Sequence, residues 1–242
     1  MATLVSVWPS LALLALPIIV AALLYPFCGL LCSAISRVFP EKVSFSLHYL
    51  GTLMHELTHA IMAIPFGIFP TSLTLRRVPG YEGVLGTLDV RYQRSLISFL
   101  GMGCVGSAPL SITMLAPAII MPESHSLLSA WLQTPQTNTF PSVLSAVLPS
   151  VLVFSWLGFP FLAYARLSRA DIRACLPLLT TLIIIACIVV STFPTFCQEF
   201  QPQVSDALNY TLASSVISLV AVLISWTSLA IMARILQPGR PR

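Results

Sequence analysis

Charged residues are scarce in this chain: Asp, Glu, Lys and Arg make up 8% of its 242 residues, whereas 57% are hydrophobic. Soluble domains usually carry about a quarter charged residues, so the composition excludes an ordinary soluble protein. A chain of this length has too much surface for its volume to hide so many apolar side chains in one core. We therefore expect the lipid bilayer to be its solvent. The net charge of +4 is modest, and no nucleic-acid partner is expected.

Several other features are missing from the sequence. No basic residue precedes the first apolar run, which therefore predicts a retained span and not a cleaved signal peptide. The chain has 6 cysteines, but all except Cys197 fall in or beside apolar stretches, so we expect no disulfide framework. No soluble segment is long enough for a separate domain. The sequence therefore predicts a single integral membrane domain over residues 1–242.

Long apolar stretches recur along the chain. A helix needs roughly 20 mainly apolar residues to cross the hydrocarbon core of a bilayer. Six stretches meet this requirement, and they cover residues 11–35, 43–64, 96–121, 143–164, 174–193 and 212–235. The sequence therefore predicts an all-α polytopic membrane protein with about six transmembrane helices.

Basic residues lie mainly on one side of these predicted spans. Arginines occur between the second and third spans, between the fourth and fifth, and after the sixth, whereas segments 122–142 and 194–210 contain no Lys or Arg. Positively charged loops stay on the cytoplasmic side. Both termini are therefore predicted to be cytoplasmic, with Arg37 and Lys42 as exceptions. The short loops favour a prokaryotic cell membrane.

The segment between the second and third spans has the pattern of β-strands. Residues 72–78 and 84–92 are rich in Leu, Val and Thr and partly alternate between apolar and polar residues. Between them lies the turn-forming stretch PGYEG at residues 79–83. We therefore expect a small β-hairpin in the loop 70–93, at the cytoplasmic surface of the membrane.

The second predicted span contains the motif HELTH at residues 55–59. His55 and His59 are four residues apart, so on a helix they point the same way and can bind one metal ion. Glu56 projects beside them, where it can accept a proton from a metal-activated water and pass it to a leaving amine. This is the spacing that zinc metalloproteases use. Ionisable residues within a span usually mark function, which favours a Zn²⁺ site over a polar packing cluster.

A third protein ligand is needed, because catalytic zinc usually takes three protein ligands and one water. His48 lies about 10 Å from His55 along the same helix, too far to bind the same ion. We prefer Asp171, at the start of the fifth span, over Asp89 and Glu82 of the hairpin, which are typical solvated residues. Asp171 has an alternative role as the third helical residue of a capping box that begins at the preceding Ser168.

The motif HELTHA in a membrane span resembles the site-2 protease family of intramembrane zinc metalloproteases. The resemblance includes Gly67, the strand-rich loop and the stretch GMGCVGSAPL at residues 101–110, and it covers approximately residues 46–176. It implies that a downstream span supplies an aspartate as third zinc ligand, a part that Asp171 would play. The chain is a divergent match, because Asp171 stands in the context SRADI and not Leu-Asp-Gly, and the Ala-Gly-Pro signature is altered to Ser-Ala-Pro.

These features together predict an intramembrane zinc metalloprotease that hydrolyses peptide bonds of membrane-embedded or membrane-adjacent substrates. Its partners would be the lipid bilayer and a membrane protein or peptide substrate. Two alternatives stay open at this point. The chain could be a non-proteolytic metal-binding membrane protein, such as a transporter or sensor, or an inactive protease relative. The intact Glu56 argues against the inactive relative, which would need no general base.

Overall fold

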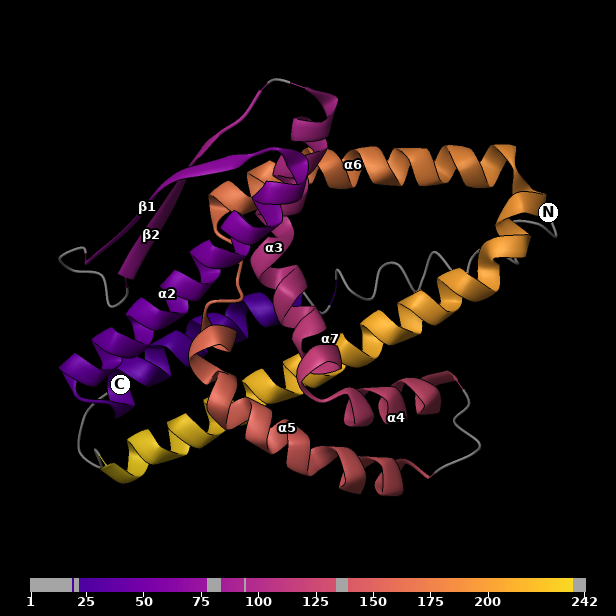
Figure 1. The fold of residues 1–242 in the computed structure, drawn as a ribbon. Coiled ribbons are helices and arrows are strands. Elements are labelled where there is room, and N and C mark those ends of the chain that lie inside the picture. Colours follow the sequence, from indigo (N-terminus) through magenta and orange to yellow (C-terminus); the bar gives the residue numbers. More distant parts are fainter. Residues whose placement is uncertain (1–18, 20–21, 78–83, 94, 134–138, 237–242) are drawn as a thin grey trace.

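The computed structural model describes residues 19, 22–77, 84–93, 95–133 and 139–236. Part of the first predicted span, 11–35, lies outside these residues, as do the centre of the predicted hairpin turn with Glu82 and the last six residues of the chain. Within the described part, helices dominate and a two-stranded antiparallel sheet lies against them (Figure 1). This mainly helical architecture with a small sheet is the one that the sequence predicted.

The elements follow one another along the chain with short connections. The first described helix is an apolar one over Ala22–Val38. After it come α2 (Glu41–Ala63), the 3-10 helix η1 (Ile64–Phe66), β1 (Phe69–Arg77), β2 (Val84–Arg91), α3 (Leu96–Ile120), α4 (Pro122–Gln133), α5 (Phe140–Ala163), α6 (Arg169–Thr192) and α7 (Pro194–Leu236).

Three of the described helices are long and apolar enough to cross a membrane: α3, α5 and the Pro202–Leu236 part of α7. The helix Ala22–Val38 is apolar but shorter. The sequence predicted about six spans, so the structure supports a membrane protein with fewer clear spans than expected. Helix α2 falls short because its three histidines and Glu56, the residues of chemical interest, lower its hydropathy.

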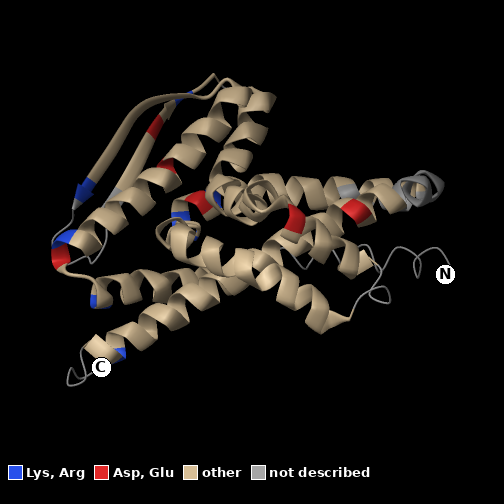
Figure 2. Cartoon of the chain, turned by 60° about the horizontal axis from the view of Figure 1, so that its bottom comes forward, with Lys and Arg blue, Asp and Glu red and all other residues tan. Residues whose placement is uncertain are grey.

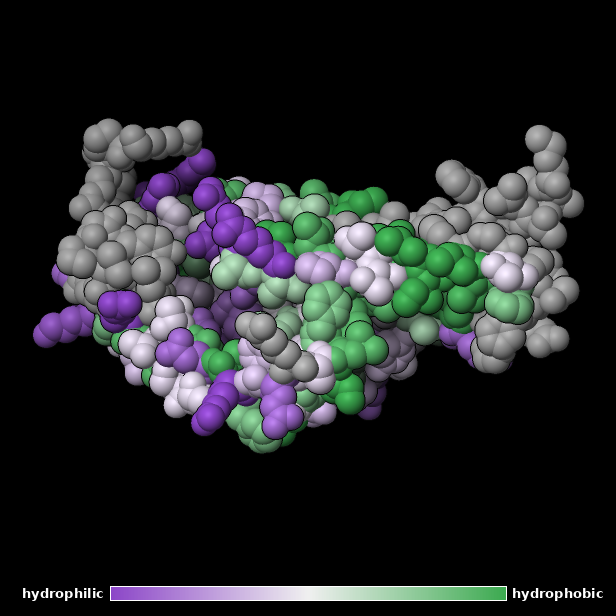
Figure 3. Space-filling model, turned by 90° about the horizontal axis from the view of Figure 1, so that it is seen from above, coloured by the Kyte–Doolittle hydropathy of each residue, from purple (hydrophilic) through white to green (hydrophobic). Residues whose placement is uncertain are grey.

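Large apolar side chains cover the outside of α6. Figure 3 shows a hydrophobic area along this helix. Soluble monomers rarely expose contiguous apolar patches larger than a few hundred Å². This surface is suited to lipid, as the composition predicted. Its exposed members are Ile172, Leu176, Leu179, Leu182, Ile183, Ile184, Ile185 and Ile188.

The described Lys and Arg residues gather toward one side of the molecule (Figure 2). The other end carries acidic residues, and there α4 lies beside α7, with the Gln133 side-chain amide donating to the Asp206 carboxylate at 3.2 Å. Basic residues are thus gathered on one side of the fold, whereas acidic residues occur on both sides (Figure 2). Which side faces the cytoplasm stays a prediction.

Helix α7 is longer than the sequence predicted, since it begins at Pro194 and not near residue 212. The expected loop 194–210 is therefore largely helical, and α4 likewise occupies much of the expected loop 122–142. Both segments are polar, but their residues are compatible with a helix. Hydropathy marks where a chain becomes apolar, and this does not have to coincide with a helix end.

Helix α3 lies at the centre of the fold and packs against α2, α6 and α7. Glycines of α3 allow α6 to approach closely. A Cβ added to Gly103 would overlap the side chain of Leu178, and one added to Gly106 would lie 2.7 Å from the carbonyl oxygen of Asp171. Small residues permit such close contacts between helix backbones. This contact holds the first turns of α6, and with them Asp171, against α3.

The predicted hairpin is confirmed. Strands β1 and β2 pair antiparallel, with Phe69 opposite Arg91 and an irregularity between Pro70 and Ser72. The chain reaches β1 through Gly67, whose φ of +65° is in the left-handed region that favours glycine. Its N–H donates to the carbonyl of Ile64 at 3.0 Å. This turn ends the α2–η1 segment and directs the hairpin back along α2.

Candidate metal centre

Helix α2 carries the three residues of the HELTH motif on one continuous helical segment. His59 and Glu56 are buried, and the His55 side chain is 11% exposed. The four-residue spacing places the two imidazole rings side by side, with ring centroids 4.8 Å apart. Their Nε2 atoms are 3.1 Å apart. The two rings therefore converge on one point, as the spacing predicted.

Asp171 comes to this point from the first turn of α6. Ser168 is the N-cap residue, and its hydroxyl accepts the Asp171 N–H at 3.1 Å. The Ser168 N–H in turn donates to Oδ2 of Asp171 at 2.6 Å. This is the capping box that the sequence suggested as the alternative role of Asp171. Capping and a place beside the histidines are therefore not exclusive, because the cap itself fixes the carboxylate at the helix start.

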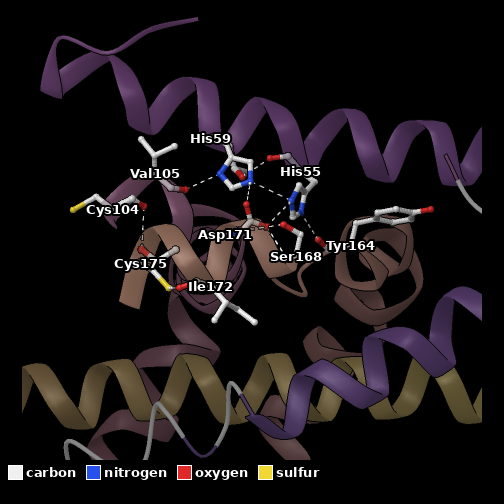
Figure 4. Close-up of polar contacts among 11 residues, drawn as sticks. His55, His59, Cys104, Val105, Tyr164, Ser168, Asp171, Ile172 and Cys175 are labelled. Carbon is white, nitrogen blue, oxygen red and sulfur yellow. Dashed lines mark hydrogen bonds and ion pairs between the residues drawn. The ribbon is translucent and has the colours of Figure 1, made fainter. Parts of the chain in front are cut away.

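The carboxylate of Asp171 faces both imidazoles (Figure 4). Oδ2 lies 3.5 Å from Nε2 of His55, and Oδ1 lies 3.3 Å from Nε2 of His59. The ligand atoms of the three residues all lie within 4.8 Å of one another. The structure thus brings together two residues of α2 and one of α6 that are far apart in the sequence.

Each imidazole is fixed from behind by a backbone carbonyl. Nδ1 of His55 donates to the carbonyl of Tyr164 at 2.8 Å, and Nδ1 of His59 donates to that of Val105 at 2.6 Å (Figure 4). A carbonyl can only accept, so each Nδ1 carries a proton. The Nε2 lone pairs of the neutral rings are then turned toward Asp171. Histidines that bind metals are typically held in this way.

The inward-facing atoms of the neutral site are all hydrogen-bond acceptors. Two Nε2 lone pairs and two carboxylate oxygens meet there, and such a set repels itself unless a proton or a metal cation lies among them. Imidazole nitrogen and carboxylate oxygen are both established zinc ligands, and three protein ligands leave a fourth position for water. The chemistry of this donor set therefore fits a divalent metal ion.

Glu56 lies next to this cluster on α2, within electrostatic range of both histidines and Asp171. Strand β2 passes over its side chain at Gly86. A Cβ added to Gly86 would lie 2.5 Å from Oε1 of Glu56, so a larger residue there would push the Glu56 side chain away from its present position. The hairpin thus shields Glu56 from solvent and keeps it beside the ligand set.

The other acidic candidates lie elsewhere or outside the described residues. Asp89 accepts a hydrogen bond from the Ser72 hydroxyl at 2.6 Å across the exposed hairpin. Glu82 lies outside the described residues. His48 is buried earlier on α2. Its Nε2 lies 2.8 Å from the Ser36 hydroxyl, and its Nδ1 lies 2.8 Å from the Tyr164 hydroxyl. Asp171 is thus the carboxylate that reaches the histidines among these candidates.

Sequence reasoning missed the two carbonyl partners, those of Val105 and Tyr164. A backbone acceptor has no residue signature, so no motif identifies it. Tyr164 is additionally held by its ring, which lies against Gly51 of α2. The turn between α5 and α6 is thereby attached to α2, which brings both the Tyr164 carbonyl and Asp171 to the histidines.

Comparison with known proteins gives no match: no family model, curated protein or solved structure matches this chain. The resemblance to the site-2 protease family therefore stays a prediction, based on HELTHA and the residues around it.

The contact between Gly106 and α6 gives a direct test of how Asp171 is placed. In Gly106→Ala, the new Cβ would lie 2.7 Å from the Asp171 carbonyl oxygen and 2.9 Å from the Ala174 Cβ. We expect α6 to shift, the protein to lose about 1–3 kcal/mol of stability, and zinc to bind more weakly. Thermal unfolding and zinc titration in detergent measure the two effects.

Gly158→Ala is the matched control, because its Cβ would meet no atom closer than 3.6 Å. Alanine is also the better helix former, so this variant should be as stable as the wild type or slightly more stable. Wild-type stability and zinc affinity in Gly106→Ala would show that the close contact does not position Asp171.

Proposed function

We propose that the chain is an intramembrane zinc metalloprotease, with His55, His59 and Asp171 as zinc ligands and Glu56 as general base and acid. One observation supports this assignment above all. The ligand atoms of the three residues lie within 4.8 Å of one another, and the glutamate of the HExxH motif stands beside them. The ligand set, its buried position and the motif all favour zinc-dependent hydrolysis of peptide bonds.

When bound, zinc lowers the pKa of a coordinated water to about 7 and polarises a carbonyl group. The residues of the chain supply the other requirements. His55, His59 and Asp171 would hold the ion. Glu56 would accept a proton from the attacking water as the water oxygen bonds to the peptide carbon. It would then give that proton to the amine as the C–N bond breaks.

The substrate would be a peptide segment in or next to the bilayer. The ligands lie on α2 and α6, which both pack against the apolar helix α3, and α6 presents an apolar surface suited to lipid. A transmembrane helix hides its amides in internal hydrogen bonds, so a substrate has to unwind locally before it is cut. We further propose about six spans with both termini in the cytoplasm of a prokaryotic cell, as the arginine distribution indicates.

Metal removal from the purified protein in lipid vesicles tests the proposal. The substrate set would be single-span peptides of varied sequence, and new peptide ends would be identified by mass spectrometry. We expect cleavage that stops when a zinc chelator is added and returns when zinc is restored. The loss should be reversible because hydrogen bonds to the Tyr164 and Val105 carbonyls and to the Ser168 N–H hold the three side chains in place without the ion.

The same vesicles separate the two alternatives. Zinc accumulation inside vesicles without peptide cleavage would establish a transporter and overturn the proposal. Zinc binding with neither cleavage nor transport across the whole peptide set would indicate an inactive relative, and it too would overturn the proposal. Vesicles without protein, treated identically, control for chemical breakdown of the peptides.

A further inference from the structure

Helix α3 contains two prolines, Pro109 and Pro117, and both lie inside the helix. In an α-helix, each carbonyl accepts a hydrogen bond from the N–H four residues later. Proline has no N–H, so the carbonyl four residues before it is left without its usual donor. In α3 these two carbonyls belong to Val105 and Thr113.

Side chains from other helices occupy both of these carbonyls. The Val105 carbonyl accepts Nδ1–H of His59 from α2 at 2.6 Å. The Thr113 carbonyl accepts the hydroxyl of Ser218 from α7 at 2.9 Å. The two prolines are therefore equivalent in local chemistry, but only Pro109 serves a residue of the metal centre.

The carbonyl that holds the second histidine has also lost its helical donor. Tyr164 is the C-cap of α5, and the residue four positions later is Ser168. Helix α5 ends at Ala163, so no helical N–H follows to donate to the Tyr164 carbonyl, and this carbonyl accepts Nδ1–H of His55 at 2.8 Å. The two histidine-binding carbonyls thus lack a helical donor for different reasons, one because of a proline and the other because the helix ends.

We infer that Pro109 is a positioning residue for the metal centre. It withholds the backbone N–H that would otherwise compete for the Val105 carbonyl, and so reserves this carbonyl for His59. The bond keeps the His59 proton on Nδ1 and presents the Nε2 lone pair to the ion. This inference rests on the metal site of the proposed function, and it assigns a role to a residue that does not touch the ion.

The physical reason lies in competition for one acceptor. An ordinary residue at position 109 would bring an N–H to the Val105 carbonyl at helical distance. The carbonyl oxygen has two lone pairs, so the two donors would share it. The His59 bond would become longer and weaker, and the ring would exchange its two neutral tautomers. Loss of such an outer hydrogen bond typically weakens metal binding by about 10- to 100-fold.

The test compares Pro109→Ala with Pro117→Ala in the full chain in detergent. Zinc affinity is measured by competition with a chromophoric chelator, and cobalt substitution reports ligand geometry by its visible spectrum. We expect Pro109→Ala to bind zinc about 10- to 100-fold more weakly, with an altered cobalt spectrum. We expect Pro117→Ala to bind zinc as the wild type does, although it restores an N–H to the same helix and disturbs the Ser218 contact.

A second measurement does not depend on the metal, and its wild-type half does not depend on the folding of a variant. Nitrogen NMR of histidine-labelled, metal-free wild type should show His59 as the Nδ1–H tautomer, and Pro109→Ala should show a mixture. Wild-type zinc affinity in Pro109→Ala, or equal weakening in both proline variants, would overturn the inference and leave the metal site standing. If the wild type binds no zinc, the proposed function fails, and a His59 tautomer other than Nδ1–H would overturn the inference as well.

Discussion

Glu56→Gln is expected to lower peptide hydrolysis by about 10²- to 10⁴-fold while the protein keeps its zinc. Glutamine has nearly the same shape as glutamate but cannot accept a proton at neutral pH. The side chain is buried between α2 and Gly86 of β2, so a substitution that preserves shape should preserve the packing. The measurement is the cleavage rate in vesicles, together with the zinc content of the same sample.

Glu123→Gln is the control for this variant. Glu123 is an exposed acidic residue in the first turn of α4, so its substitution removes one carboxylate without touching the metal centre. It should cleave at the wild-type rate. Wild-type cleavage by Glu56→Gln would remove Glu56 from the mechanism. Simultaneous loss of zinc would instead make Glu56 part of the ligand set.

The histidine pair and Glu56 were predictable from the sequence because their relation is local. Three residues within one turn of a helix hold a fixed geometry wherever the helix lies, so HELTH alone specifies their arrangement. The hairpin was predictable for a similar reason, since its strands are neighbours in the chain and a turn-forming stretch joins them. Local patterns therefore predicted the half of the candidate site that lies on α2.

Asp171 could be proposed from the sequence but not placed by it. Its approach to the histidines depends on α6 lying against α3 at Gly103 and Gly106, a contact between distant segments. The sequence offered capping and ligation as alternatives, and the structure shows the cap beside the histidines. A single carboxylate has enough oxygen lone pairs to cap the helix and to bind a metal ion, so the two roles do not exclude each other.

The carbonyls of Val105 and Tyr164 were beyond sequence reasoning in its usual form. What marks each of these carbonyls is the absence of a backbone N–H that would donate to it from four residues later in the chain. For Val105 this absence is visible in the sequence, because Pro109 has no N–H. For Tyr164 it depends on where α5 ends. The structure shows fewer clear spans than the six predicted, and α2 is one example: the polar residues that belong to the site lower its hydropathy.

Zinc content should fall from about one ion per wild-type chain to nearly none in His55→Ala and in His59→Ala. Each histidine supplies one of only three protein ligands, and its removal leaves a pair that binds weakly. Elemental analysis of the purified protein in detergent measures the ratio. His125→Ala is the matched control, since His125 is a buried imidazole of α4 bonded to the Tyr210 carbonyl at 3.0 Å. It should keep its zinc.

Asp171→Asn and Ser168→Ala separate the two roles of the aspartate. Asparagine keeps an oxygen that can accept the Ser168 N–H, so the cap largely survives, but the negative charge beside the histidines is lost. Ser168→Ala removes the other half of the cap and should cost about 1 kcal/mol of stability while zinc remains. We expect zinc to be lost in Asp171→Asn alone. Full zinc occupancy in that variant would restrict Asp171 to capping and leave the third ligand position to another group.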